Sequence, residues 1–205
     1  MTPNLEPTGR SADTTLVPPR ERILAAAQEL FYARGIRAVS VDEIAAAART
    51  NKMTLYRHFE SKDLLVAQYV RALAAQAETF WDAIARAHPG DPLAQLHAWA
   101  AGIGESLSDP GARGCAVANA AVEIPEKDHP ARAAIEEHKT HQRDRLVQCC
   151  RAAGFLEPER VADEIFLLLE GARINVQSVG RCGPGARFPA MVCALINSHK
   201  RNAQA

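Results

Sequence analysis

The chain has 205 residues, of which 47% are apolar and only 5% are aromatic, so it can form a substantial core packed mainly by alanine and leucine. Its 24 basic residues balance 24 acidic ones, and its five cysteines form no C-x-x-C pair, which favours a cytoplasmic protein over a disulfide-stabilised secreted one. No apolar run approaches the roughly 20 residues that cross a bilayer, which excludes a transmembrane protein. The scarcity of β-branched runs favours helix over sheet.

Positive charge is concentrated near the N-terminus. Residues 20–62 contain eight Lys or Arg and five Asp or Glu, a local balance of +3 that favours binding to DNA. Residues 1–19 contain four prolines and no hydrophobic period, so we expect a disordered leader. Arg10 in this leader and Arg20 just after it leave open a contact with the minor groove.

The basic region begins with two predicted helices. An apolar stripe at helical spacing predicts the first over residues 20–34, and Gly35 is expected to end it in a left-handed conformation. Ser40 and Glu43 form a capping-box pattern, which predicts a second helix over residues 41–48.

A third, short helix is predicted directly after a tight turn. Arg49 and Thr50 make the turn, and Asn51 caps a helix over residues 52–59. Two helices of this length joined by so short a turn are typical of a helix-turn-helix, whose second helix enters the major groove of DNA.

The chemistry of this third helix suits DNA recognition. Leu55 and Phe59 lie one turn apart and should anchor it inward. Lys52 suits a guanine edge or a phosphate, whereas Met53 and Thr54 suit base edges and thymine methyl groups. The predicted DNA-binding residues are Ser40, Asn51, Lys52, Met53, Thr54, Tyr56, Arg57, His58 and Lys62.

Some of these residues have a simpler interpretation when each is considered alone. Tyr56, His58 and Lys62 suit phosphate contacts. Alternatively, Tyr56 is a core aromatic residue, and Arg57 and Lys62 are solvated surface charges. The spacing and the local positive charge together favour DNA binding.

Proline, glycine and capping residues divide the rest of the chain into further helices. No strand pattern and no internal repeat are present. We therefore predict an all-α protein of about nine helices, with a helix-turn-helix domain at residues 20–65 and a helical body at residues 66–205. The later helices are expected over residues 62–87, 92–107, 114–124, 128–153, 158–180 and 186–200.

Two motifs in the basic region match a known family. They are I-L-x-A-A-x-E-L-F at residues 23–31 and T-L-Y-R-H-F-x-S-K at residues 54–62. With them, residues 22–65 resemble the tetracycline-repressor (TetR) family of bacterial transcription regulators. The resemblance implies a homodimeric repressor that reads a near-palindromic operator and is released by a small-molecule effector. Arg49 and Met53 depart from the family, which usually has glycine at both positions, and a left-handed Arg49 costs about 1 kcal/mol.

The resemblance also implies that the eighth and ninth helices form the dimer contact. The alternative is that their apolar stripes belong to the core of one chain. On the ninth helix the stripe consists of Met191, Leu195 and Ile196. On the eighth helix it consists of Val161, Ile165, Leu168, Leu169, Ala172, Val176 and Val179.

A small-molecule site in the body, between the fourth and eighth helices, is implied as well. We expect a small, largely apolar effector bound by a few polar groups on apolar faces and by nearby aromatic rings. For each residue, a satisfied polar group in the core is the alternative. The candidates are Phe80, Trp81, Trp99, Cys115, Asn119, Glu123, His138, Gln142, Phe166 and Arg173.

Three other kinds of protein remain as alternatives. An α-helical enzyme is one, although no nucleophile, phosphate-loop or metalloprotease motif is present. A metal sensor could use His138, His141 and Cys149, which share a helix, and a redox sensor could use any of the five thiols. A DNA-binding protein without an effector is the third. We expect no catalytic residue, no resident metal and no cofactor.

Overall fold

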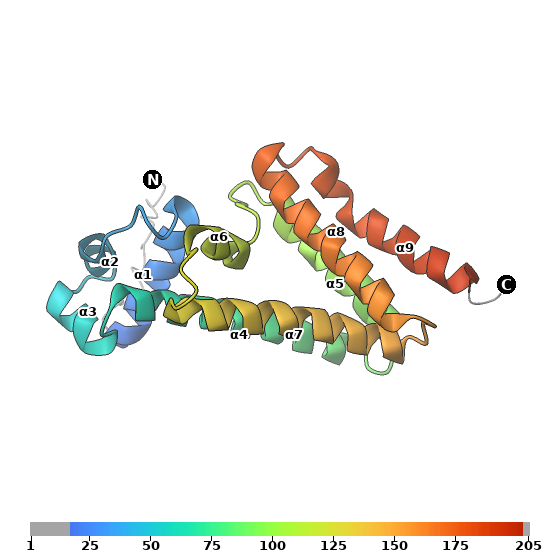
Figure 1. The fold of residues 1–205 in the computed structure, drawn as a ribbon, viewed down its shortest axis with the longest axis horizontal. Helices are drawn as coiled ribbons and strands as arrows, with labels where there is room; N and C mark the ends of the chain where they lie inside the picture. Colours follow the sequence, from blue (N-terminus) through green and yellow to red (C-terminus); the bar gives the residue numbers. More distant parts are fainter. Residues whose placement is uncertain (1–16, 203–205) are drawn as a thin grey trace, which may run out of the picture.

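The computed structural model describes residues 17–202, and in this range it contains nine α-helices, one short 3-10 helix and no strand (Figure 1). The all-α prediction is thereby confirmed. Residues 1–16 of the predicted leader lie outside the described range. The helices are α1 (Pro19–Arg34), α2 (Val41–Ala47), α3 (Lys52–His58), α4 (Lys62–Ala87), α5 (Pro92–Ser108), α6 (Ala116–Glu123), α7 (Pro130–Ala152), α8 (Pro158–Ser178), η1 (Pro184–Arg187) and α9 (Phe188–Asn202).

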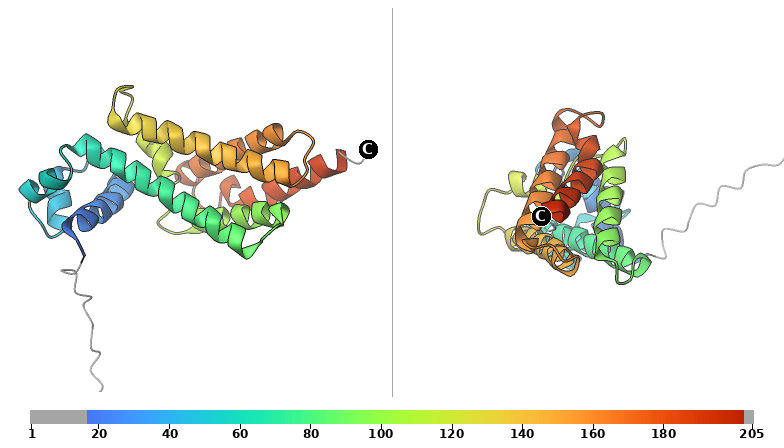
Figure 2. Two further views of the ribbon diagram at one scale, coloured as in Figure 1. Left: turned by 90° about the horizontal axis from the view of Figure 1, so that it is seen from below. Right: turned by 90° about the vertical axis from the view of Figure 1, so that its right-hand side faces the viewer.

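The molecule is elongated, with α1, α2 and α3 at one end and α5, α8 and α9 at the other (Figure 1). The long helices α4 and α7 run side by side along the long axis and connect the two ends (Figure 2). α6 lies between the ends and contacts both α4 and α7. At 1.5 Å per residue, the 26 residues of α4 span about 39 Å, so a single helix reaches from the α1–α3 end into the body.

Side-chain caps start the helices where the sequence predicts them. The Ser40 hydroxyl accepts from the backbone N–H of Glu43 at 3.2 Å, and the Glu43 carboxylate accepts from the Ser40 N–H at 2.8 Å, which completes the capping box. Asn51, Ser61 and Asp91 cap α3, α4 and α5 in the same way, through one side-chain oxygen each. These caps satisfy backbone donors that the helices themselves leave unpaired.

Two separate hydrophobic clusters fill the molecule. The first surrounds Ile23, Ile44 and Leu55 and includes residues of α4 as far as Val70, together with α6 and the start of α7. The second surrounds Trp99 and includes the buried faces of α5, α7, α8 and α9. The first cluster therefore extends beyond residue 65, the predicted end of the DNA-binding domain.

The apolar stripe predicted on α8 is mainly core rather than a free surface. Val161, Ile165, Leu169, Ala172 and Val176 are all buried within the single chain, where α8 packs against α7 and α9. These five residues are therefore core side chains of one chain, which agrees with the alternative interpretation of the stripe. Both faces of the helix are apolar, which a single hydrophobic stripe in the sequence does not reveal.

A different face of α8 is exposed and apolar. Leu167 is 70% exposed and Ile174 is 60% exposed, and Gly171 lies between them. From the predicted stripe only Val179 is strongly exposed, and on α9 Met191 is exposed whereas Ile196 is buried. The exposed side chains are spaced by three or four residues, so they lie on one side of the helix.

The ninth helix begins two residues later than predicted. Pro184–Arg187 forms a 3-10 turn, and α9 starts at Phe188. The turn lies close to α8, because the backbone N–H of Gly185 donates to the Asn175 side chain at 3.0 Å. A Cβ at Gly185 would lie 2.8 Å from the carbonyl oxygen of Ala172, so this approach requires glycine.

Candidate DNA-binding face and ligand cavity

The turn between α2 and α3 has the left-handed residue that the sequence suggests. Arg49 has φ 50°, and within residues 17–202 it is the single non-glycine residue with positive φ. Such a conformation costs about 1 kcal/mol for a residue with a Cβ. The Thr50 N–H donates to the Ala45 carbonyl at 2.9 Å, and the Asn51 side chain accepts from the Thr54 N–H at 2.9 Å. These bonds set the orientation of α3 relative to α2.

α3 has one buried face and one exposed face. Leu55 and, just after the helix, Phe59 are buried, as expected. Met53, near the start of the helix, is 77% exposed, which is unusual for an apolar side chain without a partner. The other exposed side chains of this helix are Lys52, Tyr56, Arg57 and His58.

Two of the predicted DNA-binding side chains already have partners next to α3. Lys52 Nζ lies 3.2 Å from Asp42 Oδ2, but both side chains are exposed, so this pair contributes little and leaves Lys52 able to turn toward DNA. The Ser40 hydroxyl is engaged in the capping box. Hydrogen bonds from the Ser40 backbone and hydroxyl, and then from Arg34, lower the pKa of Glu43 to about 2.

Lys62, at the start of α4, points inward rather than toward solvent. Its ammonium donates to the carbonyl oxygen of Ile36 at 2.7 Å and lies 6.0 Å from the centre of the Phe31 ring. Burial lowers the pKa of Lys62. The side chain therefore ties the first turn of α4 to the segment between α1 and α2, and one of its three N–H donors is occupied there.

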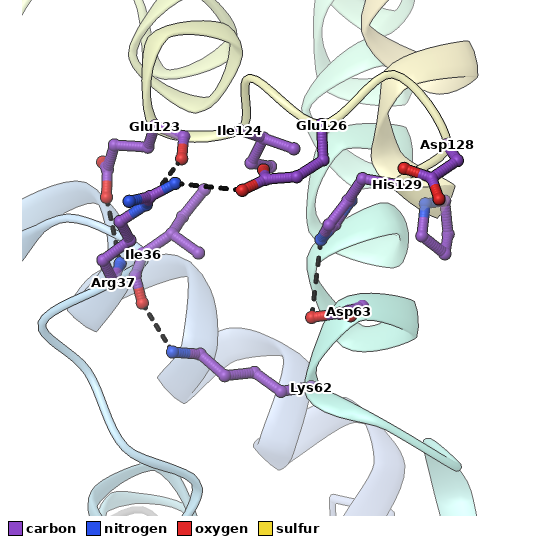
Figure 3. A pocket seen from close by; sticks show the side chains of 10 residues that line it. Ile36, Arg37, Lys62, Asp63, Glu123, Ile124, Glu126, Asp128 and His129 are labelled. Carbon is purple, nitrogen blue, oxygen red and sulfur yellow. Dashed lines mark hydrogen bonds and ion pairs between the residues drawn. The ribbon is translucent and has the colours of Figure 1, made fainter.

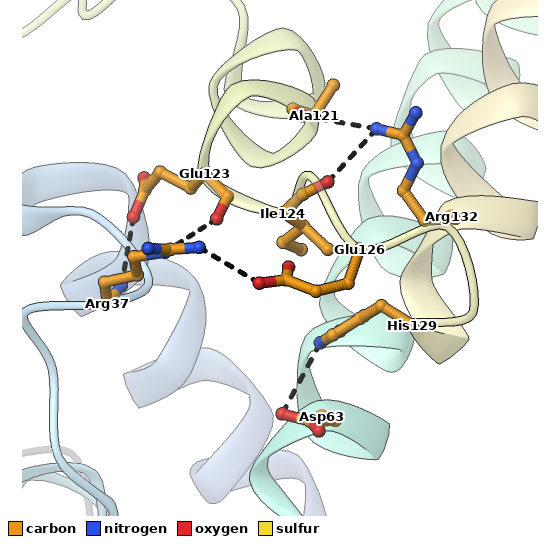
Figure 4. Close-up of polar contacts among 8 residues, drawn as sticks. All are labelled: Arg37, Asp63, Ala121, Glu123, Ile124, Glu126, His129 and Arg132. Carbon is orange, nitrogen blue, oxygen red and sulfur yellow. Dashed lines mark hydrogen bonds and ion pairs between the residues drawn. The ribbon is translucent and has the colours of Figure 1, made fainter.

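The α1–α3 end is joined to α6 by a cluster of hydrogen bonds around Arg37 (Figure 4). The Glu123 carboxylate accepts from the Arg37 backbone N–H at 3.0 Å, and the Glu123 carbonyl accepts from Arg37 Nε at 2.8 Å. Arg37 also reaches Glu126 at 3.3 Å. A second link lies nearby, where Arg113 donates from its backbone to the Tyr32 hydroxyl at 2.6 Å and from its guanidinium to the Tyr32 carbonyl at 2.7 Å.

A solvent-open hollow of about 590 Å³ lies beneath this junction (Figure 3). His129 Nε2 lies 3.4 Å from Asp63 on its far wall, and Lys62 lies on its floor. Most of the charged groups that line it are paired with one another or with backbone carbonyls. The hollow thus lies between the first turn of α4 and the end of α6.

A second cavity, of about 300 Å³, lies inside the helical body. It is bounded by the middle of α4, by α5, by the start of α6, by α7 and by α8. Seven of the ten predicted ligand residues line it. They are Phe80, Trp81, Trp99, Cys115, His138, Gln142 and Arg173.

The polar groups of this cavity are few and largely buried. Burial lowers the pKa of His138 to about 4, so its ring is neutral near pH 7. Gln142 is 6% exposed, and its Oε1 atom has no hydrogen-bond partner among the described residues. Trp81 and Trp99 stack with ring centroids 5.3 Å apart and an interplanar angle of 13°. The cavity therefore has an aromatic wall and an unused acceptor.

Three predicted ligand residues lie elsewhere. Glu123 is at the far end of α6 and holds Arg37, as described above. Asn119 donates to the Arg113 carbonyl at 2.9 Å and accepts from Gln177 at 3.1 Å, so its amide is engaged between α6 and α8. The Phe166 ring lies beside the Lys139 ammonium, 5.8 Å from it, outside the cavity. These three predicted residues therefore do not line this cavity.

Comparisons with known proteins agree with this geometry. The family model of the bacterial regulatory proteins, tetR family, matches residues 23–69, which include α2 and α3. The crystal structure of SCO4454, a TetR-family transcriptional regulator from Streptomyces coelicolor, is 28% identical, and it covers 90% of this chain and 95% of its own with a TM-score of 0.78. The chain belongs to the TetR family.

Curated relatives match this TetR-family chain over shorter segments. The HTH-type transcriptional regulator Rv1255c of Mycobacterium tuberculosis is 44% identical over 50 residues, 24% of this chain and 25% of that protein. The HTH-type transcriptional repressor DhaR of a Mycobacterium species is 27% identical over 107 residues, 52% of each chain. The matches thus span about half the length of these relatives or less.

Membership of the TetR family makes α2 and α3 the helix-turn-helix of a DNA-binding transcription regulator, rather than part of an enzyme. Proteins of this family bind DNA and dimerise, and small molecules act on them as effectors. Arg49 stands where the family usually has glycine, and its positive φ is one that glycine would adopt without strain.

Several residues at the cavity and at the junction with α6 were not predicted from the sequence of this TetR-family chain. Gln76, Ile103 and Ser106 line the cavity. Gln76 lies four residues before Phe80, so the helical period of α4 could have identified it. Arg37 and Arg113 join the two ends of the molecule, and no local pattern marks them because their partners are far away in the sequence.

The alternatives of a metal or redox sensor gain little support. No cluster of three His, Cys, Asp or Glu suited to a metal ion occurs among residues 17–202, and His141 points outward to Glu78 at 3.1 Å. Burial raises the pKa of Cys149 to about 11 and that of Cys150 to about 12, which keeps these thiols protonated and unreactive. Within the described range, no helix is both long and apolar enough to cross a membrane.

Proposed function

We propose that this TetR-family protein is a repressor that binds a near-palindromic operator as a homodimer and leaves it when a small, largely apolar effector fills the 300 Å³ cavity. Residues 20–65 form the DNA-binding domain and residues 66–205 form the domain for effector and partner. The repressor role is supported by the partial match to DhaR, which is named as a transcriptional repressor.

The DNA contacts are proposed on the exposed face of α3 and its flanks. Lys52, Met53 and Thr54 lie in the first turn of the helix, the part that reaches base edges in helix-turn-helix proteins. Tyr56 is exposed one turn later and suits a phosphate, and the backbone N–H groups at the start of α4 add to the same contact. Supporting roles fall to Ser40, Asn51, Arg57, His58 and Lys62.

The observation that best supports an effector response is the position of α6. Cys115, Ala116 and Val117, at its start, line the cavity. Glu123, at its end, holds Arg37 of the DNA-binding domain through two hydrogen bonds. One short helix thus has one end in the cavity wall and the other on the DNA-binding domain.

α4 gives a second route between the same two places. Lys62 at its start is bonded to Ile36, and Leu73 and Phe80 further along line the cavity. An effector releases DNA only if it binds more tightly to a conformation in which the two α3 helices of the dimer no longer match the operator. The difference between its binding free energies for the two conformations is the coupling between the sites. A cavity in contact with both connecting helices can supply that difference.

We place the partner contact on the exposed apolar face of α8, together with Met191 of α9. Leu167 and Ile174 project from this face, and a groove of about 210 Å³ runs past Gly171 and Met191. An apolar face of this kind is normally covered in a dimer. In Figure 1, α8 lies in the half of the molecule away from α3.

Selection of binding sites from random and genomic DNA by the purified protein, at a stated salt concentration, tests this function. We expect an enriched near-palindrome whose half-sites are about one helical turn apart or somewhat more. Enrichment of a single half-site would contradict the dimer, and no enrichment by folded protein would contradict DNA recognition by α3. The genes beside the selected sites then supply effector candidates for release assays.

A further inference from the structure

The cavity in the body has an unused hydrogen-bond acceptor. Gln142 lines the cavity, and its Oε1 atom is buried and has no donor among the described residues. Buried polar atoms in folded proteins are almost always paired, so this acceptor beside a cavity suits an occupant, water or ligand, with an N–H or O–H group. The neighbouring His138 ring is buried as well and lines the same space.

The charge of the cavity wall favours an anion. Arg173 is the charged side chain among the residues that line it, because His138 is neutral. Arg173 lies 3.2 Å from Glu170, and the same Glu170 carboxylate accepts from Lys139 at 2.6 Å. Two cations share one carboxylate, so the group has a net charge of +1 beside the cavity and no acid lines the cavity itself.

The remaining wall favours a flat ring. Trp81 and Trp99 stack on each other, and Phe80 lies so close to α5 that a Cβ at Gly102 would be 2.6 Å from its ring. Because the two tryptophans face each other and are almost fully buried, the wall suits a ring that approaches edge-on. A volume of about 300 Å³ is at the small end of the range for ligand pockets, which limits the occupant to one or two rings.

We infer that the cavity binds a small aromatic carboxylic acid bearing a hydroxyl group, with the carboxylate toward Arg173, the hydroxyl donating to Gln142 Oε1 and the ring against Trp81 and Trp99. The inference rests on the proposed function, in which the same cavity holds the effector. It names the chemical class of that effector.

Intrinsic fluorescence measures occupancy directly, because the two tryptophans of the chain both line the cavity. The full-length protein is titrated, without DNA, with meta- and para-hydroxybenzoate, benzoate, phenol and hydroxybenzylamine, and calorimetry provides the affinities. We expect the better hydroxybenzoate to bind about tenfold more tightly than benzoate or phenol, as the loss of one buried hydrogen bond predicts, and the amine to bind most weakly.

Two substitutions assign the contacts. Gln142→Leu should reduce hydroxybenzoate affinity to that of benzoate and leave benzoate within twofold, whereas Gln148→Leu, at an exposed position of the same helix, should change neither. Arg173→Met should make hydroxybenzoate bind no more tightly than phenol. The Arg173→Met substitution leaves the Glu170 carboxylate paired with Lys139.

The outcomes separate this inference from the proposed function. Equal affinities for all the compounds, or an unchanged ranking in Gln142→Leu, would overturn the assigned chemistry. No binding by protein that still selects its operator would overturn the inference alone. Failure to select any operator would instead count against the proposed function, whatever the titrations show.

Discussion

Glu123 and Arg37 are joined by two hydrogen bonds, one from the Arg37 backbone to the Glu123 carboxylate at 3.0 Å and one from Arg37 Nε to the Glu123 carbonyl at 2.8 Å. The two residues are 86 positions apart in the sequence. They connect the last residue of α6 to the segment that leads into the helix-turn-helix. Motion of α6 would therefore move the segment directly before α2.

Removing the Arg37 side chain, and with it the bond from Nε, should weaken the response to the effector without weakening its binding. In Arg37→Leu we expect effector affinity, measured without DNA, to stay within twofold, and the ratio of DNA affinities without and with effector to fall about fivefold. Titrations of operator DNA with and without effector measure the ratio. Lys127→Ala, on the exposed loop after α6, is the control and should leave it unchanged. An unaltered ratio in Arg37→Leu would assign the coupling to α4 instead.

Substitutions on α3 should distinguish residues that read the bases from residues that position the protein on the DNA backbone. Met53→Ala should change base preference at one position of each half-site, because this exposed side chain is at the first turn of the helix. Tyr56→Ala should weaken binding on all sequences to a similar extent and reduce the salt dependence. Repeating the selection with each variant, and titrating one operator at several salt concentrations, measures both effects. A changed base preference in Tyr56→Ala alone would reverse the two assignments.

The left-handed turn predicts an unusual stability order at one position. Arg49→Gly should be more stable than Arg49→Ala by about 1 kcal/mol, because only glycine adopts φ 50° without strain. Both substitutions remove the same side-chain contacts, so their difference isolates the backbone. Thermal or urea unfolding measures it. Equal stabilities would show that the turn relaxes when the arginine is removed.

Protonation of His138 should destabilise the protein in mild acid. Its pKa falls from 6.5 in the unfolded chain to about 4 in the fold, mainly because the ring is buried. The stabilisation is complete above about pH 6.5 and is lost as the pH falls toward 4, which amounts to about 2 kcal/mol at pH 5. Urea unfolding at pH 7.5 and pH 5 should show a loss that is smaller in His138→Gln by this amount. The exposed His141→Gln should retain the full loss.

The exposed face of α8 should control assembly. Ile174→Glu places a charge where an apolar face is covered, so we expect the dimer to dissociate at least tenfold more readily and operator binding to weaken with it. Sedimentation equilibrium measures the change. Val122→Glu is the matched control, since Val122 is 83% exposed on α6, away from that face. A dimer that persists unchanged in Ile174→Glu would place the contact elsewhere.

Local features of the fold were predictable because their causes are local. The caps at Ser40, Asn51 and Ser61 use contacts only three residues apart, and each appears where the sequence places it. The strain at Arg49 could be anticipated in the same way, from the kind of residue that such a turn favours.

Contacts between residues far apart in the sequence were not predictable in this way. Cys115, Asn119 and Glu123 share a predicted helix face, but only Cys115 lines the cavity, because Asn119 bonds to Arg113 and Gln177 and Glu123 bonds to Arg37. On α8, periodicity identified an apolar stripe but could not show that α7 and α9 cover it. Which side of a helix faces which neighbour depends on contacts between residues far apart in the sequence. The hydrophobic period of one helix does not show these contacts.

The separation of α8 from α3 has a genetic consequence. In the proposed dimer, a mutation that destroys α3 leaves the exposed face of α8 intact, so the altered chain would still pair with a normal one. The mixed dimer would have a single working DNA-binding helix. In a cell with one normal and one altered copy of the gene, such an allele would be dominant. Repression would fall below half of its normal level. A mutation that disables the face of α8 would instead leave the normal chains to pair among themselves and would be recessive.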